Sequence, residues 1–178
     1  MFFFKYYKQA IVKHDLINTF FYTNLTKVPS FKKLVLNFGS QKSNFRQLIS
    51  SLLALELISS KKSSLTKSNH VNILLKIKKG NPVGCKVILK KELMYSFYLR
   101  LITNIFPKIK KLQKNQQQKN PKVTKAVSVR LQNSLVFTEL ESQYQFFKSI
   151  PSLDITLLTN CNSQKELFFL LKASKFFI

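Results

Sequence analysis

The chain has 178 residues, of which 45% are hydrophobic, and this favours one folded domain spanning residues 1–178 over a disordered basic tail. It carries 30 Lys and Arg residues against 7 Asp and Glu, a formal charge of +23. A compact fold with this charge repels itself unless a polyanion neutralises it, so the composition predicts a nucleic-acid partner.

Groups that could perform catalysis are scarce, and we expect no enzymatic activity, no metal and no cofactor. Glu139 and Glu141 are the one close acidic pair; on a strand they would share a face, but we interpret them as solvated surface. Cys85 and Cys161 lack any CxxC spacing, which favours reduced thiols in the core. None of the three glycines belongs to a phosphate-binding loop pattern.

The N-terminal segment, residues 1–27, has apolar residues spaced by three and four, which predicts an amphipathic helix. No stretch of the chain approaches the roughly 20 apolar residues that a membrane span needs. The segment is also basic, so three interpretations stay open: a retained structural helix, which we favour, a mitochondrial presequence, or a helix that binds anionic lipid.

Three segments follow in chain order. Residues 31–38, FKKLVLNF, predict a short strand, and residues 45–57 have one broad apolar side that predicts a helix, capped by Ser43 or Asn44. Residues 59–69 are polar and rich in Lys and Ser. They are either a solvated loop or a loop that contacts phosphates, and we weigh the two interpretations evenly.

The centre of the chain has the strongest pattern. Residues 71–77 and 83–89 each alternate apolar and polar positions, which predicts the two strands of a hairpin with one apolar and one cationic face. The connection between them, KGNP at 79–82, is short, and Gly80 can adopt a positive φ there. The cationic face and tip would present Lys76, Lys78, Lys79, Lys86 and Lys90.

Residues 91–106 predict an amphipathic helix that Pro107 ends. Residues 108–122 are low in complexity, polar and basic, and predict a loop that is mobile or ordered by RNA. We expect strands at 123–130 and 153–159, a β-rich or irregular stretch at 135–140, and a closing helix capped by Ser163 and Glu166. This order predicts an α+β fold, a two-layer sandwich in which helices pack on one face of a mainly antiparallel sheet.

Several segments carry a resemblance. KKLVLNFG, residues 32–39, matches a KIVLN-hydrophobic-G pattern, and LKIKKGNPVGCKVILKKELMYSFYLRL, residues 75–101, matches FKIREGxPIGxKVTLRGxxMYEFLxRL at most positions. SSKKSSLTKS and LDITLLT are similar to TxxKPxxTKA and MDIxIVT. These are patterns of the bacterial and organellar ribosomal protein L5 family, which the chain resembles from about residue 28 onwards. It departs from the family at Ile88, at Arg130 and across 110–122.

The resemblance implies a structural component of the central protuberance of the large ribosomal subunit. Its partners would be large-subunit rRNA, 5S rRNA if present, P-site tRNA and neighbouring ribosomal proteins. In the family, the position of Asn37 faces 5S rRNA, and the loop matching 76–82 reaches the tRNA elbow. We therefore expect rRNA contacts at Asn37, Lys61, Lys62, Thr66, Lys67, Lys86 and Lys90, and tRNA contacts at Lys76, Lys78, Lys79, Gly80 and Asn81.

One rival interpretation is a non-ribosomal RNA-binding protein, such as an RNA chaperone or a splicing cofactor; co-sedimentation with the large subunit separates the two. Only 3 of the 30 cationic residues are arginine, which is typical of a gene of low G+C content. Organellar genomes are often of this kind, as are some bacterial and nuclear ones. We therefore expect a mitochondrial ribosomal protein, with an organellar gene as an open option.

Overall fold

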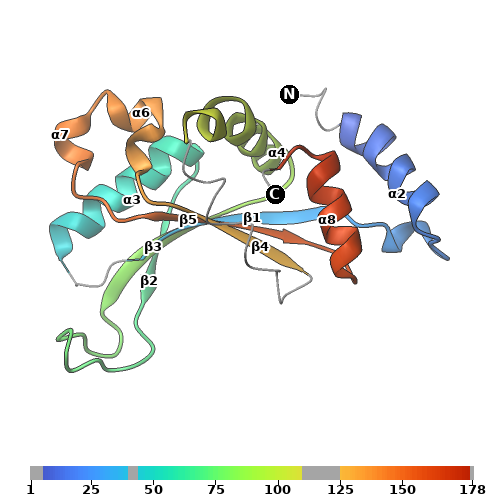
Figure 1. The fold of residues 1–178 in the computed structure, drawn as a ribbon. Helices are drawn as coiled ribbons and strands as arrows, with labels where there is room; N and C mark the ends of the chain where they lie inside the picture. The colour runs from blue at the N-terminus through green and yellow to red at the C-terminus, as the bar shows by residue number, and fades with distance from the viewer. Residues whose placement is uncertain (1–5, 40–43, 110–124, 177–178) are drawn as a thin grey trace. The chain divides into compact units, whose positions relative to one another are not determined.

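The computed structural model describes residues 6–39, 44–109 and 125–176, so most of the predicted 108–122 loop lies outside the described residues. Its strands form one five-stranded sheet in the order β2-β3-β1-β5-β4 (Figure 1). The predicted α+β class with a mainly antiparallel sheet is confirmed. The strands are β1 (Phe31–Gly39), β2 (Ser64–Lys67), β3 (Pro82–Leu89), β4 (Ala126–Leu131) and β5 (Leu153–Thr159).

The chain forms two compact units. Unit 1 comprises Met1–Leu34, Lys90–Val127 and Thr156–Ile178, and unit 2 comprises Val35–Leu89 and Ser128–Ile155. The single domain expected across residues 1–178 stays a prediction.

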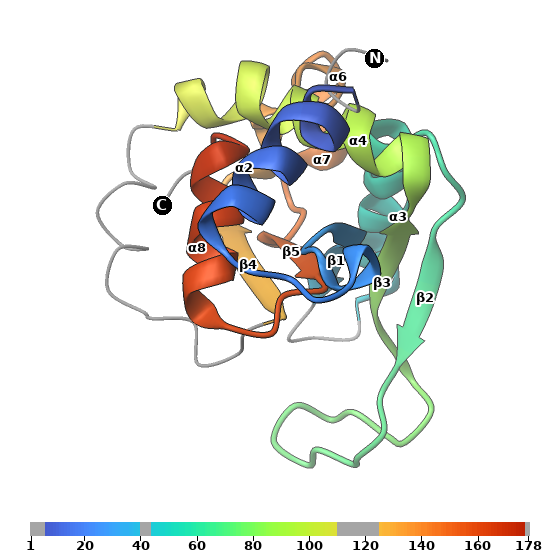
Figure 2. The same cartoon turned by 90° about the vertical axis from the view of Figure 1, so that its right-hand side faces the viewer.

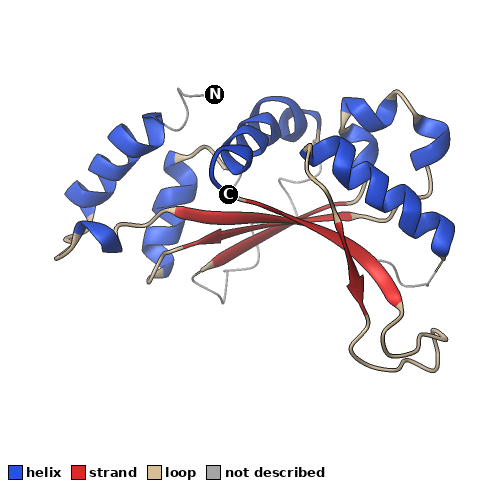
Figure 3. Ribbon diagram, turned by 180° about the vertical axis from the view of Figure 1, so that it is seen from behind, coloured by secondary structure: helices blue, strands red, loops and turns tan. Residues whose placement is uncertain are grey.

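In unit 2, the helices α3 (Phe45–Ser59), α6 (Thr138–Glu141) and α7 (Tyr144–Phe147) lie over one face of the strands (Figures 1 and 3). Helix α3 packs on β3 through an apolar side that includes Leu48 and Leu55, and the helix predicted over 45–57 is confirmed. The opposite face of these strands carries no helix among the residues of this unit that the structure describes. Unit 2 therefore has one covered and one open sheet face.

The stretch at 135–140, predicted to be β-rich or irregular, is largely helical: a 3-10 turn, Ser134–Val136, leads into α6. The Asn133 side chain accepts a hydrogen bond from the Leu135 amide at 3.0 Å, and the Ser134 hydroxyl donates to the Pro151 carbonyl at 3.0 Å. The local bond from the Asn133 side chain offers the backbone an alternative to a sheet ladder, and the bond from Ser134 ties the turn to a distant part of the chain.

In unit 1, helix α4 (Lys91–Arg100) continues as a π-helical turn, Leu101–Ile105, and a 3-10 turn, Phe106–Lys108, which confirms the helix predicted over 91–106. Pro107 lies inside the last turn. The core of the unit is aromatic: the centroid of the Tyr98 ring lies 5.0 Å from that of the Phe31 ring and 5.7 Å from that of the Phe176 ring. The buried Tyr98 hydroxyl donates to the Ser174 carbonyl, and burial raises the pKa of this phenol.

The N-terminal helix is shorter than the 1–27 segment predicted for it. A π-helical turn, Lys8–Val12, runs into α2 (Lys13–Thr19), and the chain is extended at Phe20. Helix α2 lies beside α8 (Gln164–Ala173) in Figure 2, and the predicted capping box of α8 is present. Among the described residues, no helix combines the length and apolar character needed to cross a bilayer.

Candidate nucleic-acid interface

The open face of unit 2 is set by alternation along β3. Cys85, Val87 and Leu89 are buried, and the Cys85 thiol lies 3.1 Å from the Ser51 hydroxyl of α3, so this side faces the helices. Lys86 points the other way and is exposed. Burial raises the pKa of the Cys85 thiol, although the contact with Ser51 acts against this, and the thiol therefore stays protonated.

Strand β2 adds hydroxyl groups to the open face. It pairs antiparallel with β3, and this register places Ser64 opposite Lys86 and Thr66 opposite Gly84. Residues directly opposite in a ladder share a face, so Ser64 and Thr66 lie on the side of Lys86. The Ser64 hydroxyl also donates to the Lys86 carbonyl at 3.1 Å.

Strand β1 places Asn37 on the same open side. Leu36 and Phe38 are buried in the core, so the half-buried Asn37 between them faces away from the helices. Gly84 allows the strands to approach closely: a Cβ atom there would lie 2.5 Å from the Phe38 carbonyl oxygen and 2.8 Å from the Thr66 hydroxyl. Asn37 on β1 and Thr66 on β2 thus belong to the two strands that flank Gly84 of β3.

The segment before β2, which contains Lys61 and Ser63, is hydrogen-bonded to other parts of unit 2. The Glu56 carboxylate accepts hydrogen bonds from the Ser63 amide at 2.9 Å and the Ser63 hydroxyl at 3.2 Å. Lys61 reaches back to donate from its Nζ to the Ile88 carbonyl at 2.7 Å. The predicted rRNA contact Lys61 therefore has a bond within the protein, whereas the amines of Lys62 and Lys67 are exposed.

The strand predicted at 71–77 is wrong. The strand that precedes β3 in the chain and pairs with it is β2, at 64–67, inside the segment predicted to be a polar loop. Residues 68–81 instead form a long loop closed at its base by two bonds of 2.9 Å, one from the Ser68 amide to the Asn81 carbonyl and one from the Gly80 amide to the Ser68 carbonyl. The loop extends beyond the β2–β3 ladder in Figure 2. Gly80 adopts the positive φ expected of it, at 89°.

A small turn forms the far end of this loop. Asn72 and Ile77 exchange two backbone hydrogen bonds of 2.9 Å, and the Asn72 side chain accepts from the Leu75 amide at 3.2 Å. The turn leaves Ile73 86% and Leu74 94% exposed, so the apolar alternation read as a core-facing strand is largely a solvent-facing tip. Only Ile77 of the predicted apolar face is buried.

The predicted tRNA-contacting residues surround this tip. Lys76, Lys78 and Lys79 are exposed and, with Gly80 and Asn81, belong to the one loop. Sequence reasoning missed the apolar tip because alternation alone does not reveal whether a strand has a partner. The one available signal was the Asn72 side chain, since Asn commonly hydrogen-bonds a backbone amide to form a turn.

Lys90 is the predicted rRNA contact that lies in unit 1, at the start of α4, where it is exposed. The acidic pair Glu139 and Glu141 is on α6, not on a strand. Within the described ranges there is no group of three His, Cys, Asp or Glu side chains that could hold a metal. Neither Cys85 nor Cys161 is in a disulfide, and both are buried, as predicted.

Comparisons with known proteins show which family the sequence resembles. Residues 82–177 match the profile of the C-terminal part of the ribosomal L5 family. The chain is 33% identical over 164 residues to "Large ribosomal subunit protein uL5m" of Reclinomonas americana, with 91% of this chain and 89% of that protein covered. It is 34% identical over 173 residues to "Large ribosomal subunit protein uL5" of Wigglesworthia glossinidia brevipalpis, with 96% and 94% covered.

Proposed function

Because the chain belongs to the ribosomal L5 family, it is a structural, non-enzymatic component of the large ribosomal subunit, and we propose that there it binds 5S or equivalent rRNA and contacts P-site tRNA. The observation that carries the rRNA part is the open sheet face of unit 2. On this face Asn37, Thr66 and Lys86 come from three neighbouring strands.

The chemistry of this face suits folded RNA. The Asn37 amide and the Thr66 hydroxyl are short groups fixed by the strands, which can bond 2′-hydroxyl and phosphate oxygens at defined positions. Lys86 adds a charge on the same side, and two more come from Lys62, just before β2, and Lys67, the last residue of β2. Such a surface reads the shape of the RNA backbone more than its sequence.

The loop 68–81 makes the tRNA contact in this proposal, and it offers two kinds of interaction. Lys76, Lys78 and Lys79 attract phosphates, a contribution that falls as salt increases. Ile73 and Leu74 at the tip can pack against ribose and base surfaces, a contribution that depends far less on salt. The apolar tip therefore adds a contact of a different kind to the cationic one predicted from the sequence.

A binding experiment with tRNA separates these contributions. We expect Lys78→Glu with Lys79→Glu to weaken binding and to flatten its salt dependence, and Leu74→Ser to weaken binding with the salt slope unchanged. Each variant has a matched control outside the loop. Lys148→Glu with Lys165→Glu makes the same change of charge at two exposed lysines. Phe146→Ser likewise replaces an exposed apolar side chain, one that is 70% exposed, by serine. Equal effects of variant and control would contradict the proposal for the loop.

The rRNA part is tested by salt titrations of binding to a 5S-like RNA and to an unrelated structured RNA. Asn37→Ala and Thr66→Val should reduce the preference for the first RNA, while Lys86→Gln should weaken binding to both. Absence of the protein from purified large subunits, or binding that ignores salt, would refute the proposal.

We further propose that the ribosome is mitochondrial. The low arginine content supports this, as does the similarity to a protein named uL5m, although bacterial relatives match at a comparable identity. Fractionation of the source cells, followed by detection of the protein in ribosomes of each compartment, tests it. Recovery outside the mitochondrial ribosomes would contradict this part alone.

A further inference from the structure

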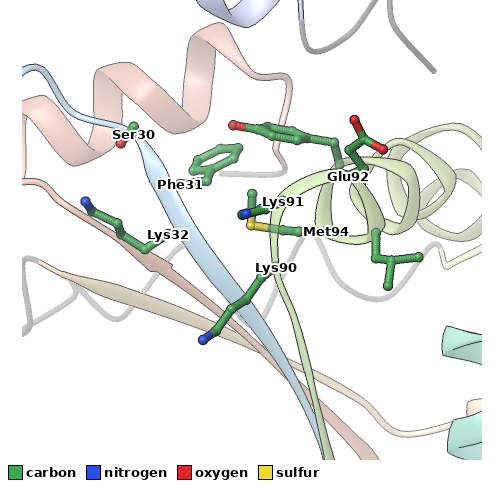
Figure 4. Close-up of a pocket in the computed structure, with 9 residues that line it drawn as sticks. Ser30, Phe31, Lys32, Lys90, Lys91, Glu92 and Met94 are labelled. Atoms are coloured by element: carbon green, nitrogen blue, oxygen red, sulfur yellow. The ribbon is translucent and has the colours of Figure 1, made fainter. Parts of the chain in front are cut away.

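Unit 1 contains a cavity of about 590 Å³ where β1 begins and the chain enters α4. Phe31 and Met94, which are both buried, form part of its wall (Figure 4). Three lysines line the same cavity: Lys32 from β1, and Lys90 and Lys91 from the start of α4. An apolar wall beside several amines can hold the ribose and the phosphate of a nucleic-acid backbone at once.

The charge of the cavity favours an anion. All three lysine side chains are exposed, and the one acidic residue in the lining is Glu92, which has interactions of its own. In Figure 4 the Glu92 carboxylate points away from the amines of Lys32 and Lys90. Those two amines also point in different directions instead of converging, which suits successive phosphates of a strand better than one small anion.

The backbone at Lys91 is strained. Its φ is +50°, in the left-handed region, which residues with a Cβ atom rarely occupy and which glycine adopts without cost. Strained positions persist where the surrounding structure enforces them, and they gather at functional sites. A lysine at this position lowers the stability of the fold but places another amine on the cavity rim.

We propose that the cavity lined by Lys32, Lys90 and Lys91 binds the phosphate backbone of an RNA strand, with Lys91 contributing a contact in spite of its strained conformation. This site lies in unit 1 and is additional to the open sheet face of unit 2. It rests on the proposed function, since it requires that the chain binds RNA.

Lys91→Gly tests the proposal because the same change relieves the strain and removes the charge. We expect a melting temperature equal to that of the wild type or up to about 4 °C higher. In a salt titration with a structured rRNA fragment, the slope should fall by about 0.7–0.9, and at 100 mM salt the association constant should fall roughly five- to eightfold. Lys175→Gly is the matched control: Lys175 is also exposed, with a φ of +54°, but it does not line the cavity.

Greater loss of RNA affinity in Lys91→Gly than in Lys175→Gly supports the proposal. Equal affinities of the two variants, with the wild type still binding RNA, overturn it while leaving the proposed function intact. Failure of the wild type to bind RNA refutes the proposed function instead. Vesicles of anionic phospholipid serve as a second probe, and a Lys91→Gly defect confined to vesicles would also overturn the RNA assignment.

Discussion

Gly84→Ala should destabilise the protein strongly, because no side chain fits at this point of the sheet. The added methyl carbon would lie 2.5 Å from the Phe38 carbonyl oxygen and 2.8 Å from the Thr66 hydroxyl. The hydroxyl can rotate away, but the carbonyl belongs to the backbone of β1, which lies between β3 and β5 in the sheet. Relief of the clash therefore requires β1 and β3 to move apart.

The two contacts set the expected magnitude. An ordinary contact of a Cβ atom is at least 3.4 Å, so the Phe38 oxygen must move by most of an ångström. Overpacking of a well-packed core costs about 1–3 kcal/mol, and a backbone obstacle places Gly84→Ala at the upper end, near 3 kcal/mol. For a chain of this length, that corresponds to a fall in melting temperature of roughly 6–12 °C.

The other two glycines are internal controls for the assay, urea denaturation followed by circular dichroism. At Gly39 the nearest atom is 4.0 Å from an added Cβ, so Gly39→Ala should change the free energy of unfolding by less than about 0.5 kcal/mol. At Gly80 there is space, but the φ of 89° is unfavourable to alanine, so a cost of about 1 kcal/mol is expected. A Gly84→Ala protein as stable as Gly39→Ala would refute the steric argument.

Three further outcomes are expected. Glu56→Gln should lower the free energy of unfolding by about 1 kcal/mol, because the glutamine oxygen can still accept the two hydrogen bonds from Ser63 but lacks the negative charge that strengthens them. Ser163→Ala should cost about 1 kcal/mol through loss of the N-cap of α8. Cys85 and Cys161 should react with a thiol reagent only as fast as the protein unfolds, because both are buried and burial raises the pKa of the Cys85 thiol.

Each of these has its own check. Glu141→Gln removes the charge of an exposed carboxylate and should leave stability unchanged, so an equal loss there would show that net charge, not the charge-strengthened bonds from Ser63, is responsible. Ser163→Asp should restore the cap, and its failure to do so would contradict the capping argument. Rapid labelling of both thiols in the native protein would show that the core opens readily.

Strong local periodicity made most of the fold predictable. Strands β1, β3 and β5 alternate in sequence and in burial, and α3, α4 and α8 carry apolar sides that the structure buries at least in part. Strand β2, at the edge of the sheet, has one apolar residue, Leu65, which is half exposed, and its other three residues are polar. Its alternation is therefore too weak to read, while 71–77 alternates clearly and has no strand to pair with.

The residues of the candidate site could be predicted from the sequence, but the contacts between them could not. The sequence and its resemblance indicate that Asn37, Thr66 and Lys86 contact RNA. They do not show that β1 and β2 approach β3 closely because Gly84 has no side chain. Likewise, nothing local shows that the amine of Lys61 bonds to the Ile88 carbonyl. Such contacts join residues that are distant in sequence, so only the folded arrangement reveals them.

The strand order also bears on how the protein is made. Strand β1 lies between β3 and β5, and β5 begins only at Leu153, after most of the chain has been synthesised. At the usual rates of translation, the ribosome needs on the order of ten seconds to extend the chain from the end of β1 to β5. For that interval Leu36 and Phe38 belong to a sheet that lacks one neighbour, so the nascent chain exposes an unpaired apolar strand.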